Sequence, residues 1–275
     1  MEQGLAGILA IFRAFEGYLL AFLLAMPRAY ALVWASQLLA PTAVPRLARN
    51  VAILVITLPI VPLTLPYTGL FVGQVGLFIA YFAKEFALGV LLGYLVFWIF
   101  WAVQAAGTLI DNQRGAAIAS SIDPLQGHEA APLGLLFSQA FITYFFSVGG
   151  FLVLTMLLYR SYPLWPITEM IPITIEAFPE LIFAVLDSGM RLAFVLAAPI
   201  VAIMFLAEFA LAMVSRFAPQ IQVFILAMPI KSALAIFVLI FYIPIMLDLS
   251  LTQARGIDDF YSRFYEILRA ARALP

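Results

Sequence analysis

The sequence predicts an all-α membrane protein, and its composition and hydropathy are the observations that predict it. Hydrophobic residues make up 65% of the 275 residues, mean hydropathy is +1.09, and 11% of the residues are charged. A soluble domain carries about a quarter charged residues, so this chain has too little charge to cover a water-facing surface of its size. Lipid tolerates an apolar exterior that water does not, and it favours helices that satisfy their own backbone.

Composition also excludes several classes of function. The net charge of -1 argues against nucleic-acid binding, which needs a basic face. No cysteine is present, so disulfides, thiolate metal sites and cysteine nucleophiles are excluded. One histidine, His128, cannot assemble a zinc site without cysteines, and Gln-Gly-His-Glu is typical of a loop. We therefore expect no enzyme and no cofactor.

Six apolar stretches predict the helices, because about 20 apolar residues suffice to cross the hydrocarbon layer. The third would be about 52 Å long as one helix, so we expect it to tilt, break or rise beyond the lipid. Prolines inside the stretches predict kinked helices. We expect one membrane domain over 1–250 and an amphipathic tail over 251–275. The stretches span residues 5–40, 51–65, 69–103, 133–159, 181–214 and 221–251.

Charges between the stretches give conflicting signals about topology. Arg46 and Arg49 favour a cytoplasmic position for 41–50, whereas the acidic, proline-rich segment 160–180 suits the opposite side. The arginines of the tail favour the cytoplasm, yet six crossings from an outside N-terminus would leave the tail outside. The sequence therefore leaves the topology open, including whether every stretch crosses the membrane.

Ionisable residues inside apolar stretches are costly and often functional. Asp187 and Arg191 are four apart on one helix face, as Arg13 and Glu16 are three apart, so each pair can meet. The alternative to a functional polar path is structural pairing between helices.

Two further charges lie on different stretches. Glu208 has no cation nearby in sequence and could bond to Lys231 or Arg191, and Lys231 follows Pro229 near the start of the sixth stretch. We expect Asp187, Arg191, Glu208, Pro229 and Lys231 to serve as polar or assembly contacts. Lys84 and Glu85 are adjacent, about 100° apart round a helix, so we expect them not to pair.

Two glycine pairs predict close helix contacts. Gly89 and Gly93 have the GxxxG spacing that lets another backbone approach, and Gly149 and Gly150 could do the same.

The segment 107–124 is neither apolar enough to span nor charged enough to be a plain loop. Asp111 and Arg114 are three apart and could neutralise one another, and a run of small residues follows them. Asp123-Pro124 is a turn signal. The segment fits a re-entrant element that lines or closes a cavity, or an interfacial loop.

Ordered motifs now indicate a family. Ile-Asp-Asn-Gln-Arg-Gly from Ile110, Ser-Ile-Asp-Pro from Ser121 and Ala-Pro-Leu-Gly from Ala131 resemble the T protein of the type III secretion export apparatus, the SctT/FliR-like family. Phe-Phe-Ser-Val-Gly-Gly-Phe from Phe145 and Met-Pro-Ile-Lys-Ser from Met228 extend the match in the same order. The Gln-Arg-Gly run resembles the injectisome branch rather than the flagellar one.

This resemblance implies helical hairpins that form part of a multi-subunit export gate in the bacterial inner membrane. It implies R- and S-type gate subunits as partners, together with the U-type switch protein and the V-type export protein, and unfolded secreted proteins as substrates. The family's gate-closing plug corresponds to 107–124, which makes its residues candidates for closing the pore. The candidates are Asp111, Gln113, Arg114, Gly115, Ala117, Ala119, Asp123 and Pro124.

A secondary transporter of small solutes is the alternative function. Broken helices and intramembrane acids such as Glu208 suggest it, but it should show inverted halves, and the sequence has no convincing internal symmetry.

Overall fold

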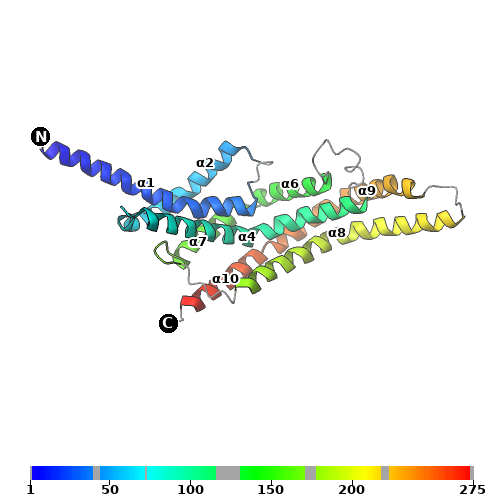
Figure 1. Ribbon diagram of the computed structural model, residues 1–275. Coiled ribbons are helices and arrows are strands. Elements are labelled where there is room, and N and C mark those ends of the chain that lie inside the picture. Colours follow the sequence, from blue (N-terminus) through cyan, green and yellow to red (C-terminus); the bar gives the residue numbers. More distant parts are fainter. Residues whose placement is uncertain are drawn as a thin grey trace. The chain divides into compact units, whose positions relative to one another are not determined.

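The computed structural model describes residues 2–39, 44–71, 73–115, 131–170, 178–217 and 223–272, and its regular elements there are helices without a strand. Figure 1 shows these helices from blue α1 to red α10. The predicted all-α fold is confirmed. The chain forms two compact units, and the expected single domain over 1–250 with a separate tail stays a prediction.

The first unit combines residues 1–97, 149–181 and 257–275. Prolines divide its second apolar stretch into short helical pieces, since each proline removes a backbone donor and starts a new element. Its elements are α1 (Glu2–Ser36), α2 (Arg46–Thr57), η1 (Leu58–Ile60), α3 (Val61–Thr64), η2 (Leu65–Leu70), the first part of α4 (Val75–Gln113), α7 (Gly150–Leu164) and α10 (Gly256–Arg272).

The second unit contains the rest of α4, α6 (Pro132–Ser147) and most of α8 (Phe178–Phe217) and α9 (Val223–Gln253). α6 packs against α9. The rings of Phe100, Phe141 and Phe145 pack together between α4 and α6, with centroids 5.2 to 6.1 Å apart. Helices α8 and α9 continue through their internal prolines Pro199, Pro229 and Pro244.

Five described helical segments are long and apolar enough to cross a membrane, and a sixth is possible if the broken pair α6 and α7 forms one span. These segments correspond to the six predicted stretches, and the broken pair is the fourth. The close backbone contact expected at Gly149 is not found, because nothing lies within 4 Å of the position of a Cβ there. Instead, its φ of +87° ends α6 and lets the chain bend before α7. The third stretch is one unbroken helix, α4, of about 58 Å.

Close packing of α1 against α4 confirms the predicted GxxxG contact. A Cβ on Gly89 would collide with the carbonyl oxygen of Arg28, and one on Gly93 would lie 2.6 Å from the Cβ of Ala35. Only glycine allows the two backbones to approach this closely.

Helix α10 is amphipathic, as the sequence predicts for the tail. Its apolar face is buried through Ile257, Phe260, Phe264 and Leu268, at helical spacing. The ring of Phe264 lies 6.2 Å from that of Phe178 at the start of α8. This contact joins the tail helix to the start of α8, and the side of the membrane on which each segment lies stays a prediction.

Candidate functional site

A buried ion cluster in the first unit joins α1 to α4. The Arg28 guanidinium donates from Nε to Glu85 Oε2 at 2.7 Å and from Nη2 to Glu85 Oε1 at 2.9 Å. Lys84 Nζ lies 2.7 Å from Glu85 Oε1, and both Arg28 and Glu85 are fully buried. We call Arg28, Lys84 and Glu85 the Arg28 cluster. Its two cations share one carboxylate.

The pairing of Lys84 with Glu85 shows that the expectation of no contact between them was wrong. The 100° angle between adjacent helical positions fixes the directions of the two Cβ atoms but not of a four-carbon stem, which bends back to reach its neighbour. Burial strengthens that attraction, because little water screens the charges.

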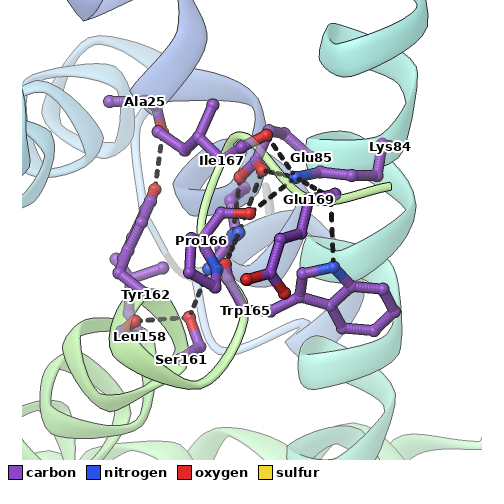
Figure 2. Close-up of polar contacts among 11 residues, drawn as sticks. Ala25, Lys84, Glu85, Leu158, Ser161, Tyr162, Trp165, Pro166, Ile167 and Glu169 are labelled. Carbon is purple, nitrogen blue, oxygen red and sulfur yellow. Dashed lines mark hydrogen bonds and ion pairs between the residues drawn. The ribbon is translucent and has the colours of Figure 1, made fainter. Parts of the chain in front are cut away.

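Lys84 also binds the backbone of the segment after α7. Its Nζ donates to the carbonyl oxygens of Ile167 at 2.9 Å, Glu169 at 3.1 Å and Pro166 at 3.2 Å (Figure 2). The Tyr81 hydroxyl donates to the carbonyl of Thr168 at 3.0 Å. One turn of α4 therefore satisfies four successive carbonyls, 166–169, that no helix or sheet would satisfy.

Arg28 fixes the end of α7 in the same way. It donates to Ser161 Oγ at 3.1 Å and to the Trp165 carbonyl at 2.9 Å, and it lies 4.0 Å from the centroid of the Tyr162 ring. The Tyr162 hydroxyl donates to the Ala25 carbonyl at 3.1 Å (Figure 2). Sequence reasoning missed Arg28. The available signal was a charge at the centre of an apolar stretch, directly after Pro27.

A second polar cluster, in the second unit, joins the end of α4 to the start of α6. Asp111, 1% exposed, accepts from Arg114 Nε at 2.8 Å, which confirms the predicted pair. Its other oxygen, Oδ2, accepts from the backbone N–H groups of Leu133 at 2.8 Å and Gly134 at 3.2 Å. These are unpaired donors of the first turn of α6, which has no side-chain cap of its own. Asp111 therefore caps α6 from another helix.

In the described part of segment 107–124, residues 107–113 form the last turns of α4, and the re-entrant element stays a prediction. Gly107 and Gly134 lie back to back: a Cβ on Gly107 would lie 2.7 Å from Gly134 Cα. Gln113 is the last residue of α4, and Gly115 turns the chain away with a φ of +90°. Ala117, Ala119, Asp123 and Pro124 lie outside the described residues, and so does His128.

Of the two partners predicted for Glu208, the structure shows Lys231 and not Arg191. Lys231 Nζ lies 3.1 Å from Glu208 Oε2, and the Glu208 side chain is 49% exposed. Asp187 and Arg191 are both exposed on α8, and no ion pair joins them in the described part of the chain. Pro229 lies exposed in the first turns of α9.

A second predicted pair, Arg13 with Glu16, is not described, because the side chain of Arg13 lies outside the described residues. Within the described residues, no group of three histidine, aspartate or glutamate side chains could hold a metal ion.

These features define a class: a multi-pass helical membrane protein whose buried charges hold loop backbone and helix ends in place. The model of the bacterial export proteins, family 1, matches residues 19–256, and the chain belongs to this family. It is a multi-pass protein of the bacterial inner membrane.

Curated relatives support the same family. The chain is 46% identical over 159 residues to the Yop proteins translocation protein T of Yersinia pestis, which covers 58% of this chain and 61% of that protein. It is 34% identical over 185 residues to the surface presentation of antigens protein SpaR of Salmonella typhimurium (66% and 68%). It is 32% identical over 158 residues to the flagellar biosynthetic protein FliR of Bacillus subtilis (57% and 61%). The match therefore spans about three fifths of the first of these relatives, and it confirms the family resemblance.

Proposed function

We propose that this chain is an export-gate subunit of a type III secretion system. It would form, with R- and S-type subunits, the inner-membrane entrance through which unfolded proteins leave the cell. The observation that carries this proposal is the family match over residues 19–256 together with 46% identity to a translocation protein of Yersinia. The comparisons do not favour the secondary transporter.

The long helices support assembly with other subunits. α8 would be about 60 Å long, twice the roughly 30 Å of the hydrocarbon layer. Along it, Phe183, Phe194, Phe205 and Phe209 are each 59 to 67% exposed. Lipid covers only part of such a helix, so sister subunits are the natural cover for the remainder.

The sharpest test is co-expression with R- and S-type subunits, followed by native mass spectrometry. We expect one complex of fixed stoichiometry, and we expect the gene to restore secretion in a strain that lacks its T-type subunit. A chain that stays monomeric beside these partners, and that moves a small solute when reconstituted alone, would overturn the proposal in favour of a transporter.

We propose in addition that segment 107–124 closes the gate at rest. The contacts of Asp111 support this role. It binds Arg114 at the start of the connection between α4 and α6 and the backbone of Leu133 at its end, so it holds the two ends of the connection together. U-type and V-type proteins would act on the assembled gate from the cytoplasm.

Arg114→Asp tests this closing role, because it replaces the buried pair with two like charges. We expect ion leakage through the assembled gate or altered secretion, and the same for Ala117→Trp and Ala119→Trp. Arg216→Asp, on the exposed end of α8, is the control with the same charge change. Conductance and secretion unchanged in all three variants would remove the closing role.

A further inference from the structure

A cavity between α7 and α10 in the first unit collects two arginines. Its volume is about 320 Å³, at the lower end for small-molecule sites. Arg160 reaches it from the last turns of α7, while Tyr265 and Arg269, four apart on one face of α10, reach it from the other wall. Pro163 and Leu164 supply an apolar floor.

The cavity concentrates positive charge without an acid to balance it. Neither Arg160 nor Arg269 forms an ion pair with an acidic side chain in the described part of the chain. Glu266 is exposed on α10 but does not line the cavity. Two guanidinium groups at one cavity repel each other, and a phosphate group relieves that repulsion because its oxygens accept the planar N–H forks in pairs.

The surroundings favour a lipid as the source of that phosphate. The candidate membrane span Leu226–Arg269 runs through α9 and α10, so Arg269 stands at the end of a segment apolar enough to cross the bilayer, where lipid headgroups are found. Tyr265, 43% exposed, combines an apolar ring with a polar hydroxyl, as aromatic residues at lipid headgroups do. We propose that Arg160, Arg269 and Tyr265 bind the phosphate headgroup of an anionic phospholipid.

Native mass spectrometry of the full chain tests this site. The chain is released from bilayers of phosphatidylglycerol and phosphatidylcholine, and retained lipid is counted. We expect phosphatidylglycerol to be retained in preference, with about a fivefold loss of affinity for Arg160→Gln or Arg269→Gln and about 25-fold for both together. The double lysine variant keeps the charge without the forks and should bind with intermediate affinity.

Arg255→Gln with Arg263→Gln is the matched control, since it removes two exposed arginines that do not line the cavity. It should retain lipid as the unmodified chain does. Equal losses in the two double variants would reduce the site to general surface charge and overturn the proposal. If inorganic phosphate added to the sample occupies the site and the chain shows no preference for phosphatidylglycerol, the ligand is free phosphate and the lipid proposal is overturned. Unchanged lipid retention in the Arg160 and Arg269 double variant would overturn the proposal outright. None of these outcomes depends on whether the chain takes part in export.

Discussion

Replacing Glu85 with leucine removes the one carboxylate that two buried cations share. Arg28 loses hydrogen bonds of 2.7 and 2.9 Å, and Lys84 loses an ion pair of 2.7 Å. All three groups are buried, so water does not replace the lost partner. The variant therefore leaves two positive charges close together in a medium of low dielectric constant.

The size of the effect follows from what each cation retains. Removing one partner of a buried ion pair destabilises a protein by about 3 to 5 kcal/mol. Lys84 keeps three carbonyl oxygens, and Arg28 keeps Ser161 Oγ and the Trp165 carbonyl. These acceptors favour the lower end, about 3 kcal/mol. For a chain of this length the melting temperature should fall by about 6 to 12 °C.

Thermal unfolding of the full chain in detergent, followed by tryptophan fluorescence, measures that shift. Glu208→Leu is the matched control, because its carboxylate is 49% exposed and has one contact of 3.1 Å with Lys231. A pair of that kind contributes about 1 kcal/mol or less. Equal melting temperatures for the Glu85 and Glu208 variants would refute the reasoning. Replacing Arg28, Lys84 and Glu85 together with methionine should recover much of the loss, because no unpaired charge then remains.

Two further predictions concern helix packing. Gly93→Leu should separate α1 from α4, because its Cβ would lie 2.6 Å from the Cβ of Ala35. Its melting temperature should be well below that of the control Gly76→Leu, because a Cβ at residue 76 has nothing within 4 Å. Asp111→Ala should lower the free energy of unfolding by about 2 to 4 kcal/mol, since it leaves an arginine and two backbone donors of α6 without their acceptor. The control Asp248→Ala, on the exposed face of α9, should change it by about 0.5 kcal/mol or less. Comparable melting temperatures within either pair would contradict that prediction.

The helices could be predicted from the sequence because lipid leaves few alternatives. Apolar length alone located all six stretches, and the GxxxG spacing correctly located the α1–α4 contact. The ends of the helices were harder to predict from the sequence. α4 continues to Gln113 although the apolar stretch ends near residue 103, because Asp111 and Arg114 neutralise each other and allow polar residues to stay helical.

The polar contacts were harder to predict, because they join residues far apart in the chain. Spacing on one helix predicted Asp111 with Arg114, but it also favoured Asp187 with Arg191, and both of those side chains are exposed without an ion pair in the described structure. Arg28 and Glu85 are 57 residues apart, and no pattern along one helix connects them. Only the close approach of α1 and α4 does so.

The two clusters apply one rule with opposite signs. In each, a buried charge binds backbone groups of a connecting segment. Lys84 donates to the carbonyls of Pro166, Ile167 and Glu169, and Asp111 accepts from the amides of Leu133 and Gly134. Irregular backbone in a membrane protein needs partners of this kind, since lipid offers none. A cation suits carbonyls and an anion suits amides, so exchanging the charges would remove these contacts from both segments. Lys84→Glu should therefore expose the backbone amides of 167–169 to hydrogen exchange. Lys84→Met should expose them less, because methionine removes the three hydrogen bonds from Lys84 but adds no repulsion. Equal exchange in the two variants would show that the charge of Lys84 does not hold this segment.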